Sequence, residues 1–160
     1  MNTGAAILDD ETFLSRFEAG TFPLAQWHHR EHIKVAYLYL RSHPFEIAVQ
    51  LMRAGIRGLN AAHGVPDEPT RGYHETMTQA WMRLVQLTLC EYGPAGSADE
   101  FFDLNPQLAE KKVLRFFYSR DRMMSAEAKA GFVEPDLAPL PKSPKKPQMD
   151  TAWQSRNQRR

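Results

Sequence analysis

The chain of 160 residues is long enough for one domain with its own core, and its composition, 42% hydrophobic and 24% charged, excludes disorder along the whole length. The net charge of +1 is unevenly distributed: residues 142–160 carry six cationic side chains and one acidic one, a net of +5, so residues 1–141 carry −4. An acidic body argues against nucleic acid as a partner, because nucleic-acid-binding domains present a basic face.

The sequence predicts neither a membrane span nor a secretory signal. No run approaches the roughly 18 apolar residues that a membrane helix needs, and the first ten residues lack a basic segment followed by a long apolar one. The single cysteine, Cys90, excludes an internal disulfide and a cysteine-based zinc cluster. We therefore expect a cytoplasmic protein with no membrane partner.

The first half of the chain is predicted to form three helices. Asp9 or Asp10 caps the first helix, and Gly20 follows its end. Pro23 suits the first turn of the second helix, and Pro44 ends that helix and begins the third. The predicted spans are 10–19, 23–43 and 44–63.

The second half also lacks the strict alternation of apolar and polar residues that indicates strands. Gly72 leads into a fourth helix, Ser97 begins a capping-box pattern for a short fifth, and Pro106 begins a sixth. Ser125 caps one last turn. The fourth and sixth helices are predicted to end at Tyr92 and near Tyr118. We predict an all-α, single-domain bundle of about six helices over residues 1–141, followed by a disordered Pro-, Lys- and Arg-rich tail over 142–160.

Three histidines lie on the apolar face of the predicted second helix. At about 100° per residue, His28, His29 and His32 fall within the arc that holds its apolar side chains. A buried histidine needs hydrogen-bond partners, so three on one face are unusual. The opposite face carries Arg30, Lys34, Tyr37 and Arg41.

The next two predicted helices add further histidines. His74 lies near the centre of the apolar face of the fourth helix, with Glu75 at the border of that face, and His63 extends the apolar stripe of the third. Short connections would make neighbouring helices antiparallel. The residues then expected to gather at one end of the bundle are His28, His29, His32, His63 and His74, with His43 at the other end.

Imidazoles from facing helices, with a carboxylate nearby, suit a divalent transition metal such as Zn, Fe, Mn or Cu. The predicted ligands are His29, His32 and His74, although His28 with His32 is a competing chelate that spacing alone does not separate. Glu75 would be a ligand or the general base acting on metal-bound water. His63 is the second candidate catalytic residue.

Four residues near this cluster are candidates for substrate binding. Arg71, beside Gly72, could hold an anionic substrate, and Tyr73 follows it. A sixth helix that returns toward the cluster would bring Tyr118 and Arg120 close as well. Each also has a structural interpretation, since tyrosines pack in cores and loop arginines are commonly solvated.

Several segments resemble a family of small, uncharacterised bacterial and fungal proteins. The segments are Trp27 to Ala36, with a Trp-x-His-x-x-His-Leu motif in which Ile33 replaces Leu; Ala62 to Gly64; and Gly72 to Thr76, with a Gly-Tyr-His-Glu-Thr motif. His29, His32, His63, His74 and Glu75 match this pattern, whereas His28 occupies a variable position. The resemblance favours His29 over His28 and implies no reaction.

Two functional hypotheses follow from these residues. The first is a metal-dependent enzyme that acts on a small molecule, by hydrolysis or by oxygen chemistry, with a metal-free acid–base pair of His74 and Glu75 as a variant. The second is a non-catalytic protein that binds a small molecule or serves as an accessory protein, and whose histidines form a buried polar network.

Overall fold

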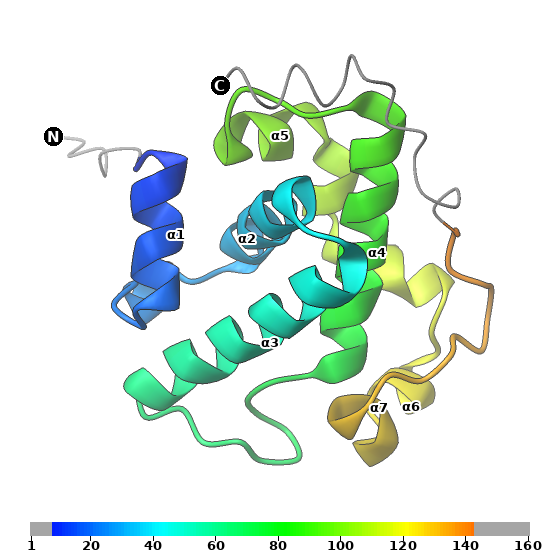
Figure 1. The fold of residues 1–160 in the computed structure, drawn as a ribbon. Coiled ribbons are helices and arrows are strands. Elements are labelled where there is room, and N and C mark those ends of the chain that lie inside the picture. Colours follow the sequence, from blue (N-terminus) through cyan, green and yellow to red (C-terminus); the bar gives the residue numbers. More distant parts are fainter. Residues whose placement is uncertain (1–7, 143–160) are drawn as a thin grey trace, which may run out of the picture.

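The computed structural model describes residues 8–142, and their regular structure is helical (Figure 1). The α-helices are α1 (Asp10–Glu18), α2 (His29–Ser42), α3 (Phe45–Ala62), α4 (Glu75–Tyr92), α5 (Ala98–Leu104), α6 (Arg120–Met123) and α7 (Ala126–Ala130). The 3-10 helices are η1 (Leu24–Gln26), η2 (Pro106–Ala109) and η3 (Lys111–Phe116). Residues 8–142 contain no β-strand, only an isolated bridge between Glu68 and Arg71. The all-α prediction is confirmed, and the predicted tail lies outside the described residues apart from Lys142.

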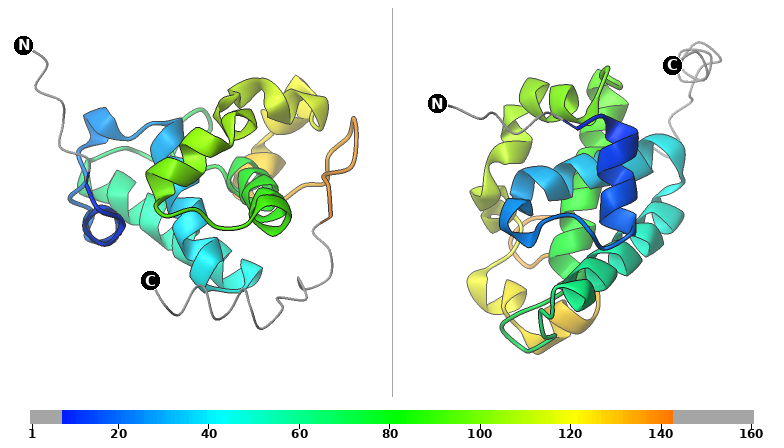
Figure 2. Two further views of the ribbon diagram at one scale, coloured as in Figure 1. Left: turned by 90° about the horizontal axis from the view of Figure 1, so that it is seen from above. Right: turned by 90° about the vertical axis from the view of Figure 1, so that its left-hand side faces the viewer.

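The central helix is α2, which α1, α3, α4 and α5 surround (Figure 2). Every residue from Ile33 to Leu40 is buried, so the prediction of a polar face was wrong for Lys34 and Tyr37. The Tyr37 ring stacks on Phe101 of α5, with centroids 4.1 Å apart. The Lys34 ammonium lies 3.1 Å from Asp99. A helix wheel detects one apolar face, but it does not show that a second helix covers the other side.

Contact between α1 and α3 is close because α3 has no side chain at one point of contact. Gly55 lies where an added Cβ would overlap the ring of Phe17, which is fully buried. That ring in turn stacks on Trp27, with centroids 5.0 Å apart and planes inclined by 12°. Gly55 therefore lets α1 pack against α3 and sets the position of Trp27 through Phe17.

Three helix starts agree with the capping residues read from the sequence. The Asp9 carboxylate accepts a hydrogen bond from the Thr12 N–H at 2.7 Å, and the Ser97 and Ser125 hydroxyls cap α5 and α7. These side chains satisfy backbone N–H groups that have no partner within the helix.

Three predicted helices differ from the structure. The second is split, because the chain is extended at Trp27 and His28 and α2 begins only at His29. The fourth begins at Glu75 rather than Gly72. The sixth is replaced by η2 and η3, followed by the short α6. Figure 2 (right) shows this segment leading from α5 to α6 along one side of the molecule.

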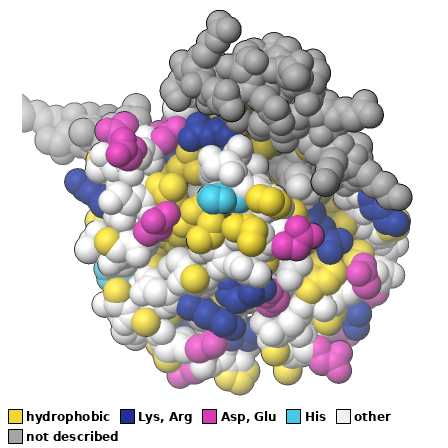
Figure 3. Space-filling model, viewed as in Figure 1, with side chains coloured by type: hydrophobic (Ala, Val, Ile, Leu, Met, Phe, Trp, Pro, Cys, Tyr) yellow, Lys and Arg dark blue, Asp and Glu magenta, His cyan; other side chains and the backbone are white. Residues whose placement is uncertain are grey.

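The surface shows no strong segregation of charge on the face seen in Figure 3, where side chains of both signs lie between small apolar patches. Within residues 8–142, no helix combines the length and apolar character needed to cross a membrane.

Candidate functional site

A pocket of about 1060 Å³, here called the histidine pocket, lies between α2, α3 and α4 on one side and the segment from η3 to α6 on the other. Its walls are mainly apolar and include two tryptophans and several methionines. Four of the six histidines also line it. The lining side chains used below are Trp27, His28, His29, His32, Tyr73, His74, Met77, Trp81, Lys111, Arg115, Tyr118, Arg120 and Met124.

Two imidazoles of the pocket pack against its two indoles. The His29 ring lies 4.5 Å from the Trp81 ring, and the His32 ring lies 4.4 Å from the Trp27 ring, measured between centroids. Helix α2 places both histidines one turn apart at its start, so they share a face. Each imidazole is thus held between an aromatic wall and the open pocket.

Hydrogen bonds fix one ring nitrogen of each imidazole and leave the other unpaired. His29 Nε2 donates to the Leu108 carbonyl at 2.7 Å, and His32 Nδ1 donates to the His28 carbonyl at 3.0 Å. His29 Nδ1 and His32 Nε2 have no partner in the described chain. Since no fully buried side-chain nitrogen of residues 8–142 lacks a partner, neither atom is completely buried.

Both imidazoles are neutral at pH 7. Burial lowers the pKa of His29 and of His32 below the usual 6.5, and the nearby charge of Lys111 lowers both further. A neutral imidazole with one N–H committed presents its other nitrogen as an acceptor. The pocket therefore offers two hydrogen-bond acceptors on an apolar wall.

His74 is the N-cap of α4 and has both ring nitrogens engaged. Nδ1 accepts from the Met77 N–H at 3.1 Å, and Nε2 donates to the Met123 carbonyl at 2.9 Å. Burial lowers the pKa of His74, which keeps the ring neutral as this arrangement requires. The imidazole thus begins α4 and fastens it to the end of α6.

Glu75 is buried and its carboxylate is fully engaged. Arg53 forms an ion pair with it, Tyr73 donates its hydroxyl, and the Gln79 amide donates at 2.9 Å. Burial alone would raise the pKa of Glu75, but the bonds from Arg53, Tyr73 and Gln79 lower it to about 2. A carboxylate with this pKa is a weak base, and Glu75 is not among the residues that line the histidine pocket.

The four candidate substrate-binding residues separate in the structure. Tyr73, Tyr118 and Arg120 line the histidine pocket. The Tyr73 hydroxyl is committed to Glu75, and the Tyr118 hydroxyl donates to the Val133 carbonyl at 2.8 Å. Arg71 is exposed on the 65–71 loop, where its backbone pairs with Glu68, and it does not line the pocket.

The predicted gathering of five histidines is therefore incomplete. His28, His29, His32 and His74 line one pocket. His63 is the exposed C-cap of α3, and its Nε2 lies 2.7 Å from the Phe22 carbonyl, outside the pocket lining. Its catalytic role stays a prediction that this placement does not favour.

The three-histidine metal site expected from the sequence is not supported. Across residues 8–142, no three His, Cys, Asp or Glu side chains are grouped so that they could hold a metal ion. His74 is not free to bind a metal ion, because two backbone groups already form hydrogen bonds with its ring nitrogens. Of the three predicted ligands, only His29 and His32 keep a ring nitrogen without a partner among the described residues.

Sequence reasoning missed the cations and the aromatic walls of the pocket. Lys111 and Arg115 belong to η3, which the sequence presented as part of an ordinary helix. Trp27 and Trp81 lie in the wall of the pocket rather than in the closed core. In the sequence, Trp27 is next to His28 and Trp81 lies in the apolar stripe of α4, and both positions could have indicated a place near the histidines. Only the fold shows that a cavity lies between the two rings.

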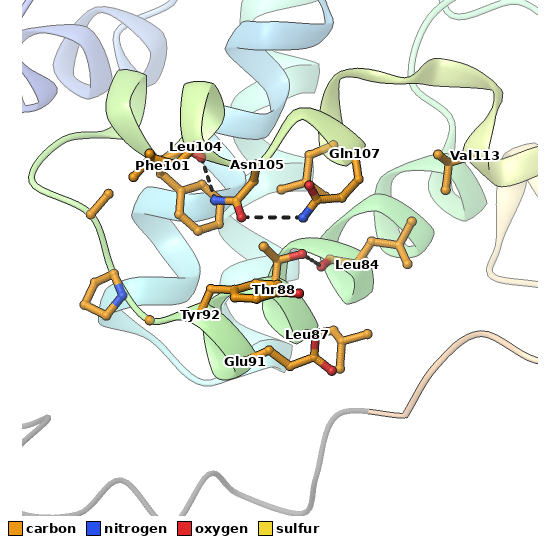
Figure 4. A pocket seen from close by; sticks show the side chains of 14 residues that line it. Leu84, Leu87, Thr88, Glu91, Tyr92, Phe101, Leu104, Asn105, Gln107 and Val113 are labelled. Atoms are coloured by element: carbon orange, nitrogen blue, oxygen red, sulfur yellow. Dashed lines mark hydrogen bonds between the residues drawn. The ribbon is translucent and has the colours of Figure 1, made fainter.

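A smaller pocket of about 660 Å³ lies between the end of α4 and the segment from α5 to η3 (Figure 4). Its two buried polar side chains, Thr88 and Asn105, are already bonded. The Thr88 hydroxyl donates to the Leu84 carbonyl at 2.8 Å, and the Asn105 amide donates to the Phe101 carbonyl at 2.7 Å. This α4–α5 pocket therefore offers few free polar groups to a ligand.

Comparison of the chain with protein-family models, with curated proteins and with solved structures finds no match. The functional argument therefore depends on the geometry of the histidine pocket.

Proposed function

We propose that the protein binds a small organic molecule in the histidine pocket. The observation that carries this proposal is a mainly apolar cavity of about 1060 Å³ lined by two imidazoles, each of which keeps one ring nitrogen unpaired within the described residues. Ligand sites are typically apolar clefts of roughly 300–1,000 Å³ with a few convergent polar groups. The cytoplasmic location expected from the sequence stays a prediction.

The chemistry of the walls indicates the kind of ligand. Trp27 and Trp81 offer flat apolar surfaces, and the methionines offer adaptable ones. His29 Nδ1 and His32 Nε2 would accept hydrogen bonds from a hydroxyl or N–H of the ligand. The proposed ligand is thus a largely apolar, aromatic or aliphatic molecule with at least one donor group.

A fluorescent apolar probe tests this proposal directly. N-phenylnaphthylamine is uncharged and emits strongly in apolar surroundings, so its titration into the protein measures occupation of such a pocket. Met77 and Leu87 are both half-buried on α4, but Met77 lines the histidine pocket and Leu87 lines the α4–α5 pocket. They therefore form a matched pair for substitution.

Met77→Trp fills the histidine pocket and should weaken probe binding about tenfold or more, a loss of about 1.4 kcal/mol or more. Leu87→Trp should leave it unchanged. Absence of saturable binding to the parent, or loss of binding in Leu87→Trp alone, would overturn the proposal. Met124→Trp, at an exposed position of the same pocket, repeats the test if Met77→Trp does not fold.

A metal-dependent enzyme at the same pocket is the second proposal. It is favoured by one observation: His29 and His32, three residues apart, have lowered pKa values and each keeps one ring nitrogen without a partner in the described residues. Two imidazoles would leave further positions on a Zn, Fe, Mn or Cu ion for water or substrate.

Elemental analysis after dialysis against a weak chelator tests this second proposal. Near-stoichiometric metal that is lost in folded His29→Ala and His32→Ala, but retained in His43→Ala, would support it. His43 is an exposed histidine at the far end of α2 and does not line the pocket. Failure of the parent to take up any of the four metals would overturn it.

A further inference from the structure

The charged residues of the histidine pocket are all cationic. Lys111, Arg115 and Arg120 line it, and no Asp or Glu among the described residues does. The sign of the charge in the pocket is thus opposite to that of residues 1–141 as a whole, which carry a net charge of −4. A cleft lined by one sign of charge raises the local concentration of ligands of the opposite sign.

No acidic side chain in the described part of the chain pairs with these three cations, in contrast to the cations that the fold uses in ion pairs. Arg30, Lys34, Arg53 and Lys129 each form an ion pair with Asp or Glu within 3.1 Å. Lys111, Arg115 and Arg120 form no ion pair or side-chain hydrogen bond within residues 8–142. Their charges are therefore available to a ligand.

The cations and the tryptophans of the pocket come from different elements. They belong to the segment from η3 to α6, whereas Trp27, Met77 and Trp81 belong to the side formed by α2, α3 and α4 and the residues before α2. Lys111 is near enough to lower the pKa of both His29 and His32. All the lysines and arginines of the pocket thus come from the η3–α6 side, and both tryptophans and the neutral imidazoles come from the opposite side.

We propose that the ligand is an amphipathic organic anion whose carboxylate or similar oxyanion group lies at Lys111, Arg115 and Arg120, with its apolar body against Trp27 and Trp81. This inference rests on the proposed binding function and adds the chemical class of the ligand. Lysine and arginine bind oxyanions through charge-assisted hydrogen bonds.

Two probes that differ only in charge separate this inference from the binding function itself. Anilinonaphthalene sulfonate is N-phenylnaphthylamine with one added sulfonate group. We expect the sulfonate to bind the parent about tenfold more tightly than the neutral probe and to lose affinity as salt rises, because salt screens exposed charges.

The triple variant Lys111→Gln, Arg115→Gln, Arg120→Gln should lose about tenfold in affinity for the sulfonate and keep its affinity for the neutral probe. The control is Arg16→Gln, Arg71→Gln, Lys112→Gln. It removes the same charge from exposed positions outside the pocket that form no side-chain interaction in the described chain. Near-UV circular dichroism verifies packing, since loosely packed states also bind the sulfonate.

The outcomes are distinct. The inference is overturned if the pocket triple variant binds the sulfonate as tightly as the parent does, or if both triple variants lose the same affinity for it. In either case, binding of the neutral probe by the parent leaves the proposed function standing. Failure of both probes to bind the parent would overturn both. Single substitutions at the three positions repeat the test if the triple variant does not fold.

Discussion

Glu75 carries a carboxylate that three neighbours hold in place, and this explains its burial. Arg53, in the middle of α3, supplies the charge, and Tyr73 and Gln79 complete the hydrogen bonds. The sequence shows Glu75 beside His74 and so favours catalysis. It does not show Arg53 as a partner, because the two residues are 22 positions apart and meet only when α3 packs against α4.

Glu75→Gln should lower the free energy of unfolding by about 1–3 kcal/mol at pH 7, a range that allows for screening because Arg53 is one-third exposed. The folded-state pKa of about 2 lies below the usual 4.5, so the stabilisation is present above pH 4.5 and is lost as pH falls toward 2. Urea titrations at several pH values should therefore show the parent and the variant converging in acid. A constant difference down to pH 2 would contradict this account.

Three imidazoles of the pocket also make the stability of the fold depend on pH, and in the same direction as Glu75 does. Burial lowers the folded-state pKa of His29, His32 and His74 below 6.5, so the unfolded chain binds protons more readily. Stability is then at its full value above about pH 6.5 and falls as pH decreases through that range. The unfolding midpoint in urea, measured from pH 8 to pH 5, should decrease less in His32→Gln than in the parent. An increase on acidification would show that these rings are stabilised by protonation.

At the scale of the helices, the contact between α1 and α3 reaches the pocket through aromatic rings. Gly55 admits Phe17, Phe17 stacks on Trp27, and Trp27 packs on His32. The position of one glycine in α3 therefore sets the shape of the pocket wall.

Gly55→Ala should destabilise the fold by about 1–3 kcal/mol, because the added methyl group displaces the buried Phe17 ring. It should also weaken binding of N-phenylnaphthylamine. Gly58→Ala is the matched control on the same helix, since an added Cβ there meets nothing within 4 Å. It should stabilise the fold by about 0.5–1 kcal/mol through helix propensity. Equal effects of the two substitutions in thermal unfolding would exclude the proposed contact.

The helices that sequence patterns predicted best are those with local signals at their ends. Pro44 begins α3 and the capping serines begin α5 and α7 as expected. The segment from residue 106 to 118 was predicted wrongly because its shape depends on distant contacts. One of them joins the Leu108 carbonyl to the His29 imidazole, 79 residues away.

For the whole molecule, four of the five histidines that the sequence grouped line one pocket, whereas the fifth, His63, does not. The cavity between them could not be predicted, since an apolar residue in a sequence has the same pattern whether it packs in the core or lines a pocket. The charge reversal in the pocket was hidden for a related reason. Lys111, Arg115 and Arg120 come together only through η3 and α6, which have weak sequence signals.

Ligand binding should stabilise the whole domain. At a free ligand concentration one hundred times Kd, the gain is about 2.7 kcal/mol, provided the ligand binds only the folded chain. Thermal unfolding should therefore move upward with added anilinonaphthalene sulfonate in the parent and much less in the pocket triple variant. A downward shift would mean that the probe prefers the unfolded chain.

The central claim, that the histidine pocket is the ligand site, is tested most directly by nitrogen NMR of the imidazole rings during titration with anilinonaphthalene sulfonate. Only the ring nitrogens that face a ligand should respond. We predict shifts at His29 and His32, with His43 and His63 unchanged because both lie outside the pocket. Shifts confined to His43 or His63, or no shift at any histidine despite binding, would contradict the claim.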